Sequence, residues 1–341
     1  MNRLFKLRCS RIFIASCVMV WMFMSAGCAG TTVPNTNPAA PTSGPRVEST
    51  KRPIVKPKPT SKPAPKPTAK PAVTPARTLQ TGTTLKVYFL DVGQADSILI
   101  TSDGASMLID AGNNADGPGV VDYLKSKGIS KLDYVIGTHP HEDHIGGLDD
   151  VIDNFNIGKV IMSRMDSTTK TYRDVLAAEQ NKGLTTTYAA VGTKFTFKSA
   201  TFEILAPDRI GPDANENSVV LRLVFQRERF LFCGDADFLS EAAMANTVAR
   251  LGETLDADVI KIGHHGSATS SAASFLRAVS PDYAVISVGA DNTFGHPTQT
   301  ALSAIAAVGA KVFRTDRMGT IIMSTDGKSI KVTEEATAID G

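Results

Sequence analysis

The segment THPHEDHIGG, residues 138–147, carries three of the six histidines of this 341-residue chain, with two acidic residues among them. The neutral imidazole nitrogen is the commonest metal ligand in proteins, and packing alone seldom crowds histidines in this way. His139 and His141 alternate along an extended segment and can turn to one metal ion. Asp143 and His144 lie beyond a turn and can reach a second ion. The segment therefore predicts a metal site where the buried strand pattern DYVIGTH ends.

The remaining histidines also follow predicted strands. They lie in KIGHHGS (residues 261–267) and FGHP (residues 294–297), and each cluster contains glycine. Polar side chains at strand ends can converge at one edge of a sheet without being buried in its core. The apolar runs of this chain end in Asp91, Asp110, His139, Asp235, His264 and Asn292. We expect the site at this shared edge.

A site for two metal ions also needs a carboxylate that bridges them and a further imidazole. Asp235 directly follows the apolar pattern RFLFCG, which makes it the predicted bridge. Either His264 or His265 can supply the imidazole. Two cations about 3.5–4 Å apart polarise a phosphoryl or acyl oxygen and lower the pKa of a bridging water.

Residues 81–341 alternate predicted strands and helices with short turns. Buried strands are expected at LKVYFLDV and DYVIGTH, a hairpin turn at Asp103-Gly104, and a helix around residues 240–252. Mixed strand pairs with crossover helices predict an α/β fold in which helices cover two layered sheets.

HPHEDH, residues 139–144, matches the H-x-H-x-D-H signature of the metallo-β-lactamase superfamily. More narrowly, residues 85–330 resemble the soluble domain of ComEC-type DNA-uptake proteins. The motifs that carry this resemblance are FLDVGQADSILI, LIDAG, THPHEDHIGGL, ENSVVLRL, FLFCGDAD, VIKIGHHGSATS and ISVGADNTFGHP. The resemblance implies an αββα sandwich, with two mixed β-sheets flanked by helices and a metal site at one edge.

The resemblance also implies two divalent metal ions, Zn or Mn, and a role for each matching residue. The implied metal ligands are His139, His141, Asp143, His144, Asp235 and either His264 or His265. His139 and His141 would bind one ion, Asp143 and His144 the other, and Asp235 would bridge them. The implied catalytic residues are Asp143, Asp235 and His296. His296 resembles a late histidine that stabilises or protonates the phosphate or leaving group in superfamily phosphodiesterases.

A further set of residues is predicted to support the ligands or contact substrate. These residues are Asp91, Gln94, Asp96, Asp110, Asn217, Ser218 and Ser267. Asp91 and Asp110 are expected to orient loops or ligand imidazoles. Gln94 and Asp96 contact substrate or hydrogen-bond their own turn. Ser267 holds a phosphate, or the serines near it cap the following helix.

One departure from the superfamily pattern concerns the first metal ion. No histidine lies between His144 and His264, so the usual third imidazole on that ion is absent. Asn217 or Ser218 is expected in its vicinity. The first ion is then weakly held, or it is an oxygen-preferring ion such as Mn²⁺.

Residues 1–28 have the pattern of a secretory signal. Basic residues precede the apolar run IFIASCVMVWMFM, which is too short to span a membrane comfortably. The next residues, SAGC, resemble the lipobox of bacterial lipoproteins, in which cleavage leaves the cysteine N-terminal and lipid-modified. An ordinary signal peptide that contains Cys28 is the alternative. Either interpretation predicts an exported protein, and the first predicts a membrane-anchored lipoprotein at the cell surface.

The rest of the chain divides into a tether and a folded domain. Residues 29–80 hold twelve of the eighteen prolines, with Lys or Arg between them, and are predicted to be a disordered, extended tether. Residues 1–80 carry thirteen Lys and Arg against one acid, so residues 81–341 carry a formal charge of −10 in a chain of +2. This charge does not favour broad electrostatic capture of nucleic acid.

Cys233 lies in an apolar strand pattern and is predicted to be a buried small hydrophobe.

The predicted function is an exported, lipid-anchored phosphodiesterase, specifically a nuclease acting on extracellular DNA. One alternative is a phosphodiesterase or phosphorylcholine esterase acting on cell-wall teichoic acids. Another is a non-catalytic binding lipoprotein that keeps its metal for structure. After Met24 no stretch of eighteen residues is apolar throughout, so a role in DNA uptake would need a separate channel protein as partner. The sequence predicts no oligomeric state.

Overall fold

The computed structural model of the chain describes residues 82–336 and residue 339. The predicted signal peptide, the lipobox Cys28 and the tether lie outside these residues. Within the described part, no helix has the length and apolar character needed to cross a bilayer.

A mixed sheet of eight strands forms one layer of the domain. Its strands are, in spatial order, β17 (Ile330–Glu335), β16 (Thr320–Thr325), β1 (Leu85–Phe89), β2 (Ser97–Ser102), β3 (Ala105–Ala111), β5 (Tyr134–Gly137), β7 (Val160–Met162) and β8 (Thr187–Tyr188). Neighbours from β17 to β3 are antiparallel, and those from β3 to β8 are parallel. The predicted hairpin is confirmed: β2 turns into β3 through Asp103 and Gly104, which both have positive φ.

A second mixed sheet of seven strands forms the other layer. Its strands are, in spatial order, β15 (Lys311–Arg314), β14 (Tyr283–Ile286), β13 (Val259–Lys261), β12 (Glu228–Phe232), β11 (Val220–Phe225), β10 (Ala200–Ala206) and β9 (Lys194–Phe197). Neighbours from β9 to β12 are antiparallel, and those from β12 to β15 are parallel. A separate pair joins β4 (Lys131–Leu132) to β6 (Asn156–Ile157).

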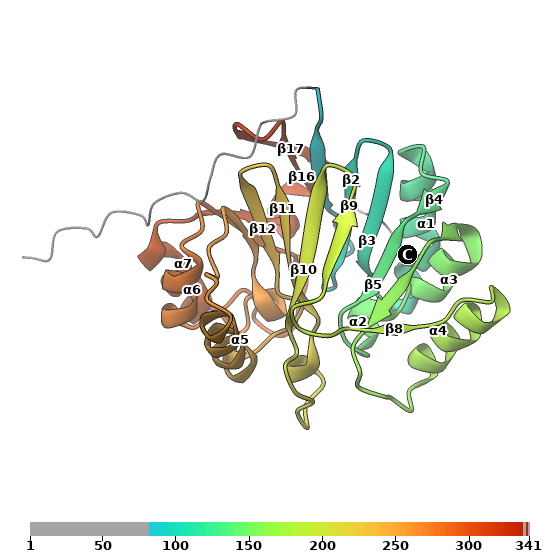
Figure 1. Cartoon of the computed structure of the whole chain (residues 1–341), viewed down its shortest axis with the longest axis horizontal. Helices are drawn as coiled ribbons and strands as arrows, with labels where there is room; N and C mark the ends of the chain where they lie inside the picture. The colour runs from blue at the N-terminus through green and yellow to red at the C-terminus, as the bar shows by residue number, and fades with distance from the viewer. Residues whose placement is uncertain (1–81, 337–338, 340–341) are drawn as a thin grey trace, which may run out of the picture. The chain divides into compact units, whose positions relative to one another are not determined.

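Helices cover the outer face of each sheet (Figure 1). The first sheet is covered by α1 (Gly117–Ser126), α3 (Leu148–Asn154) and α4 (Lys170–Asn181). The second is covered by α5 (Phe238–Arg250), α6 (Ala273–Val279) and α7 (Gln299–Val308). The helix expected around residues 240–252 is α5, which begins earlier because the Asp237 side chain accepts hydrogen bonds from two amides of its first turn. Short helical segments are α2 (Glu142–Ile145), α8 (Thr315–Met318), η1 (Asn114–Asp116), η2 (Asn215–Asn217) and η3 (Gly263–Gly266).

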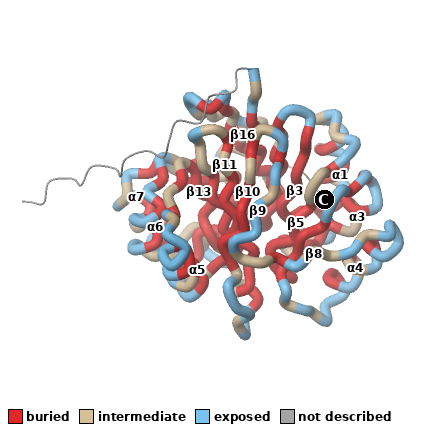
Figure 2. The backbone as a smooth tube through the Cα atoms, in the orientation of Figure 1, coloured by how far each residue is buried: buried red, intermediate tan, exposed pale blue. Residues whose placement is uncertain are grey.

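Strand β1 shows why the layers form. Leu85, Val87 and Phe89 join the buried cluster shared by the two sheets, whereas Tyr88 joins the cluster under the helices of the first sheet. Successive side chains of a strand point to opposite faces, so β1 contributes buried side chains to two different clusters, while Lys86 is exposed. Buried clusters therefore lie between the sheets and under each helical layer (Figure 2). This arrangement confirms the predicted αββα sandwich.

Loops after three strands carry the predicted ligands, and a fourth strand carries Asp110. The H-x-H-x-D-H segment follows β5, Asp235 follows β12, the HH pair follows β13, and Asp110 is the last residue but one of β3. Figure 1 shows α2, which contains Asp143 and His144, beyond the ends of β3 and β5. Ligands from both sheets are thus brought to one end of the sandwich.

Candidate metal centre

Asp110 anchors the loop that carries the first four predicted ligands. It has a left-handed backbone (φ 57°), and its carboxylate accepts hydrogen bonds from the amide and hydroxyl of Thr138 at 2.8 and 2.7 Å. Nδ1 of His144 lies 2.8 Å from the same carboxylate. A proton held on Nδ1 leaves Nε2 of His144 free to bind a metal ion. This is the contact that the predicted orienting role of Asp110 requires.

Two glycines let this loop pack tightly. A Cβ atom on Gly146 would lie 2.2 Å from the backbone carbon of Asn113, and one on Gly147 would lie 2.6 Å from the carbonyl oxygen of Ala111. Real Cβ atoms do not approach backbone this closely. The IGG end of the motif is therefore required for the turn from α2 into α3.

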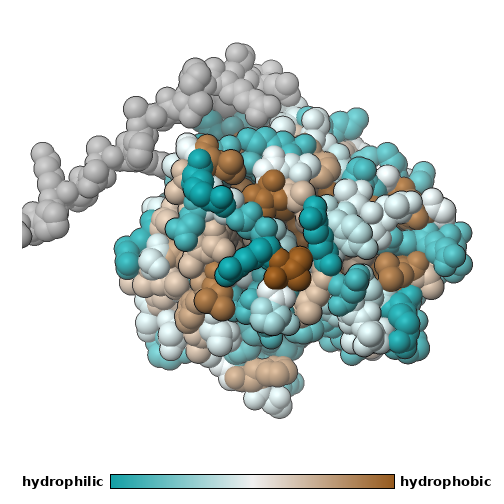
Figure 3. All heavy atoms as spheres, turned by 60° about the horizontal axis from the view of Figure 1, so that its bottom comes forward, coloured by the Kyte–Doolittle hydropathy of each residue, from teal (hydrophilic) through white to brown (hydrophobic). Residues whose placement is uncertain are grey.

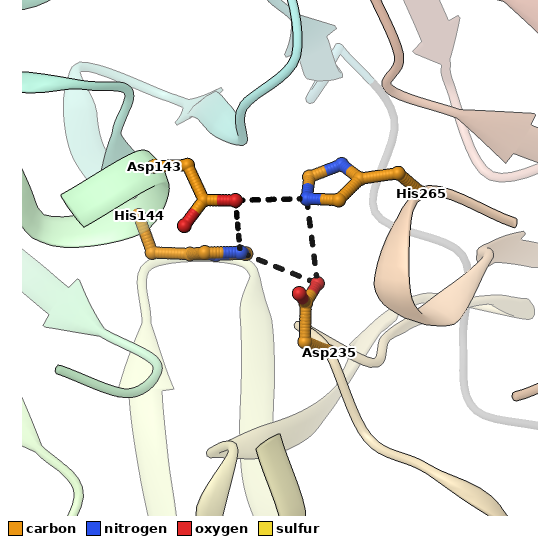
Figure 4. Close-up of side chains that lie close together, drawn as sticks. All are labelled: Asp143, His144, Asp235 and His265. Atoms are coloured by element: carbon orange, nitrogen blue, oxygen red, sulfur yellow. Dashed lines mark ion pairs between the residues drawn. The ribbon is translucent and has the colours of Figure 1, made fainter. Parts of the chain in front are cut away.

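Asp143, His144, Asp235 and His265 converge on one point (Figure 4). One ligand atom from each lies within 4.8 Å of the others. Nε2 of His144 lies 3.2 Å from Oδ1 of Asp235, and Nε2 of His265 lies 3.4 Å from Oδ2 of Asp143. In the described part of the chain, both of these Nε2 atoms and this Oδ1 atom are buried without a hydrogen-bond partner. Since buried polar atoms are normally satisfied, and two imidazoles with two carboxylates suit Zn²⁺ or Mn²⁺, these residues fit a metal ion.

The electrostatics of the cluster favour a cation. Burial lowers the pKa of His144, but Asp235 and Asp110 raise it more, and the resulting pKa lies well above 6.5. Burial raises the pKa of Asp143 and Asp235, but the nearby His144 lowers both below their usual range. A buried carboxylate, Asp235, and a partly buried one, Asp143, therefore lie beside two imidazoles, and a divalent cation would offset their charge.

His139 and His141 form a second pair of ligand candidates. Nε2 of His139 lies 3.0 Å from Nδ1 of His141, so the two nitrogens can bind one ion. Burial, followed by the nearby His144, lowers the pKa of His139 well below 6.5 and keeps it in the neutral form that metal binding needs. Nδ1 of His139 lies 3.4 Å from the hydroxyl oxygen of Ser218, which also accepts a hydrogen bond from the amide of Asp235. Ser218 thus contacts the ring nitrogen of His139 that does not face His141.

The structure separates the adjacent His264 and His265. Both have left-handed backbones, with φ of 50° and 51°, and their side chains diverge. His265 is buried, and its Nδ1 lies 3.0 Å from the carbonyl oxygen of Ser287, so a proton there leaves Nε2 for the four-residue cluster. His264 is 25% exposed, and its Nε2 lies 3.8 Å from Oδ2 of Asp235. Of the two alternatives, the geometry favours His265 as the ligand and places His264 at the open side of the site.

His296 lies beside His264, with ring centroids 5.7 Å apart. Its Nδ1 is 3.5 Å from Nε2 of Gln94, whose carbonyl oxygen accepts a hydrogen bond from the amide of Gly289. Burial, and then the neighbouring His264 and His265, lower the pKa of His296, so the ring is neutral at pH 7. The structure thus brings two predicted residues, Gln94 and His296, together at the edge of the metal cluster.

Other predicted residues have different surroundings. The side-chain amide of Asn217 binds backbone groups of Gly211 and Asp213 and so holds the 211–213 loop. Ser267 contacts Thr269, and its amide donates to the carbonyl oxygen of His264. The carboxylate of Asp91 accepts a long hydrogen bond, 3.4 Å, from the amide of Gly93. Ser267 is thus joined to the site through the backbone of His264.

One contact at the site was not predicted. Lys261, the last residue of β13, is fully buried, and its Nζ lies 2.6 Å from Oδ2 of Asp96. The lysine inside the apolar run VIKIG could have indicated this contact, because a charged side chain in a buried strand needs a partner.

The prediction for Cys233 is confirmed: it is buried, and burial raises the pKa of its thiol.

Residues 90–290 match the family model described as the metallo-beta-lactamase superfamily. The chain belongs to this superfamily. The match and the fold confirm the predicted recognition, and with the four-residue cluster they support a metal-dependent hydrolase. The bacterial metallo-β-lactamase-fold protein YhfI from Bacillus subtilis is 14% identical, with a TM-score of 0.48, over 71% of this chain and all of that one.

The chain is also similar to two longer proteins. It is 33% identical over 235 residues to competence protein ComA of Neisseria gonorrhoeae, covering 68% of this chain and 31% of that protein. It is 27% identical over 255 residues to ComE operon protein 3 of Bacillus subtilis, covering 69% of this chain and 32% of that protein. The chain therefore matches about a third of the length of these relatives, and it is a ComEC-like member of the superfamily.

Proposed function

We propose that the chain is an exported, lipid-anchored phosphodiesterase that cleaves DNA. The convergence of Asp143, His144, Asp235 and His265 carries the metal-dependent reaction class, because one ligand atom of each of the last three is buried without a hydrogen-bond partner. The similarity to competence protein ComA supports DNA as the substrate. Cys28 would carry the lipid, and the basic, proline-rich segment after it would hold the domain away from the membrane.

The residues would divide the work as follows. His139 and His141 would hold one divalent ion, and Asp143, His144 and His265 would hold the other. Asp235 lies beside His144 and interacts electrostatically with His139, so it would contribute to both sets. Bound there, the ions would polarise a phosphoryl oxygen and acidify a water molecule. Asp110 keeps the proton of His144 on Nδ1, and the carbonyl of Ser287 does the same for His265.

His296 is placed to act on the phosphodiester itself. Its neutral ring can donate one N–H to a phosphate oxygen or to the leaving group. Gln94 contacts Nδ1 of His296, and so it can orient the ring. His264 lies on the same side and can contact a phosphate oxygen.

Phe294 supports a nucleic-acid substrate in particular. It is 70% exposed, and its ring stacks on that of His296, with centroids 5.7 Å apart and planes 23° apart. Bases stack on exposed aromatic side chains irrespective of sequence. On the face turned forward in Figure 3, hydrophobic side chains lie among hydrophilic ones. An aromatic surface beside His296 suits a nucleotide better than it suits a polyol phosphate.

A teichoic acid phosphodiester is the second candidate, because the domain lacks the net positive charge that binding along a DNA backbone normally uses. Residues 81–341 carry a formal charge of −10, so they offer no general attraction to a DNA backbone beyond what bound metal ions provide. A substrate held mainly at one phosphodiester would not need a basic groove. In DNA uptake, the domain would act beside a channel protein.

The test uses the full chain in detergent micelles, loaded with Zn²⁺ or Mn²⁺. Bis-p-nitrophenyl phosphate reports the phosphodiesterase reaction, and labelled single- and double-stranded DNA and purified teichoic acid compete as natural substrates. We expect metal-dependent cleavage of DNA that falls at least ~100-fold in His141→Ala and is kept in Asp153→Asn, a change on the exposed face of α3. Cleavage of teichoic acid but not DNA would favour the second candidate, and two bound ions without turnover of any diester would favour a non-catalytic lipoprotein.

A further inference from the structure

Lys261 and Asp96 form a buried ion pair between the two sheets. Lys261 ends β13 of the seven-stranded sheet, and Asp96 directly precedes β2 of the eight-stranded sheet. Their side chains are almost completely buried, and Nζ and Oδ2 lie 2.6 Å apart. Neither charge can be buried without the other except at a large penalty. The pair therefore links the two sheets directly.

Asp96 is also tied to the loop that carries the metal ligands. Its amide donates to the carbonyl oxygen of Asp143 at 3.0 Å, and its own carbonyl accepts from the amide of Gly112 at 2.9 Å. Gly112 follows the end of β3, two residues after Asp110. The backbone of Asp96 thus joins the end of β3 to the loop that contains Asp143 and His144.

The Asp96 carboxylate lies behind both ligand imidazoles. Its Oδ2 is 3.9 Å from Nδ1 of His144, and its Oδ1 is 3.6 Å from Nδ1 of His265. The Nε2 atoms of both rings are the ones that face the four-residue cluster. Oδ1 of Asp96 is buried without a hydrogen-bond partner, so it is free to compete for the proton on His265. The other oxygen of Asp96, Oδ2, forms the ion pair with Lys261, which offsets the negative charge of the carboxylate.

The position of this pair matters because the ligands come from both halves of the sandwich. Asp143 and His144 follow β5 of one sheet, whereas Asp235 and His265 follow β12 and β13 of the other. A metal ion holds such ligands well only if the sheets keep the four atoms at the correct separation. Lys261 lies four residues before His265 on the same strand and loop.

We propose that Lys261 and Asp96 are a positioning pair for the metal centre. The pair holds the His144 half and the His265 half of the site at a constant separation. The Lys261 cation also keeps the Asp96 carboxylate from drawing Nδ1 of His265 away from the carbonyl oxygen of Ser287, which lies 3.0 Å from it. Nε2 of His265 therefore stays directed at the cluster. This inference concerns the metal centre and does not depend on which phosphodiester is cleaved.

The test compares Lys261→Met, Asp96→Asn and the double variant with the wild-type full chain. Lys194→Met is the matched control, because Lys194 pairs with Glu253 at the surface of the same sheet. Two quantities are measured without any substrate. One is the affinity and stoichiometry of Zn²⁺, from competition with a chromogenic chelator. The other is the thermal midpoint of the metal-free protein in EDTA.

We expect both single variants to lose ~10–100-fold in Zn²⁺ affinity, as removal of supporting partners of metal ligands does. The double variant buries no unpaired charge, so its metal-free midpoint should return toward the wild-type value while its affinity stays low. If a single variant fails to fold, the Zn²⁺ affinity of the double variant still tests whether the pair positions the metal ligands. Wild-type Zn²⁺ affinity in the double variant would overturn the proposal and leave the pair as an ordinary element of fold stability.

Discussion

The Asp110 carboxylate lies 2.8 Å from Nδ1 of His144, and both side chains are fully buried. The same carboxylate accepts hydrogen bonds from the amide and the hydroxyl of Thr138. A carboxylate can only accept hydrogen bonds, so Nδ1 of His144 must carry the proton and Nε2 faces the metal cluster. One acidic residue at the end of β3 thus determines the tautomer of a ligand on a different loop.

Replacing Asp110 with asparagine tests this relationship with little change in volume. An amide –NH₂ turned toward Nδ1 would favour the opposite tautomer, in which Nε2 carries the proton and cannot bind a metal ion. We expect the Zn²⁺ affinity of the site to fall ~10–100-fold in Asp110→Asn. Chelator competition measures the affinity, and Asp153→Asn, a change on the exposed face of α3, is the control. Equal affinities in the two variants would contradict the assigned tautomer.

The neighbouring histidines His264 and His265 offer a matched pair of alanine variants. His265 faces the four-residue cluster with an unpartnered Nε2, so His265→Ala should reduce bound metal from two ions per chain toward one. His264→Ala should keep both ions, because its Nε2 lies 3.8 Å from Oδ2 of Asp235 and is not among the four converging ligand atoms. Elemental analysis after gel filtration gives the stoichiometry. Loss of an ion in His264→Ala with retention in His265→Ala would reverse the assignment.

The candidate ligands were predictable because each group of them has a local signal in the sequence. H-x-H-x-D-H places four donors within six residues, and Asp235 and the HH pair directly follow apolar runs that had to be strands. The choice between His264 and His265 was not predictable. Both follow β13 with left-handed backbones, and such a turn sends adjacent side chains in directions that residue order does not reveal.

The Lys261–Asp96 pair shows a second limit of the sequence. Its members are 165 positions apart and meet only because β13 and the segment before β2 lie in different sheets at the same end of the sandwich. Asn217 shows a third limit. A polar residue near the expected gap in the ligand set was a reasonable candidate, but its amide binds the 211–213 loop instead, since that loop has backbone groups to satisfy.

Glu241 predicts how stability depends on pH. This residue of α5 accepts hydrogen bonds from the amides of Ser271 and Ala272, which follow the HH loop. Burial raises its pKa from 4.5 to about 7. The folded chain therefore binds this proton more tightly than the unfolded chain, and the stability that it contributes is complete below pH 4.5 and is lost as pH rises to about 7.

Glu241→Gln should remove this dependence. The free energy of unfolding of the variant minus that of the wild type should be ~1–3 kcal/mol larger at pH 8 than at pH 5, because only the wild type loses stability over this range. Urea unfolding in EDTA measures both proteins without metal. Glu253→Gln is the control, because the hydrogen bond from Lys194 lowers the pKa of Glu253 and confines its effect to more acidic solution. Parallel curves for Glu241→Gln and the wild type would contradict the prediction.

Phe294 gives the sharpest test of the proposed substrate. Its ring stacks on His296 and is 70% exposed, and Asn292 holds its loop in place by accepting from the amide of His296 and donating to the carbonyl oxygens of Gly289 and His296. A base next to the cleaved phosphate can therefore stack on a preorganised aromatic face. Since stacking contributes ~1–3 kcal/mol per base, Phe294→Ala should lower kcat/KM for a DNA oligonucleotide by roughly 5- to 150-fold.

The substrate can be changed as well as the protein. An oligonucleotide that lacks the base beside the cleaved phosphate should be cut equally by the wild type and by Phe294→Ala, because no base is present to stack on residue 294. In Phe294→Trp, the base should raise kcat/KM as much as it does in the wild type, because the indole ring can also stack. A loss in Phe294→Ala that is the same with and without the base would show that Phe294 acts only by supporting His296. A wild-type protein that cuts neither oligonucleotide but hydrolyses teichoic acid would instead reject DNA as the substrate and leave the metal centre intact.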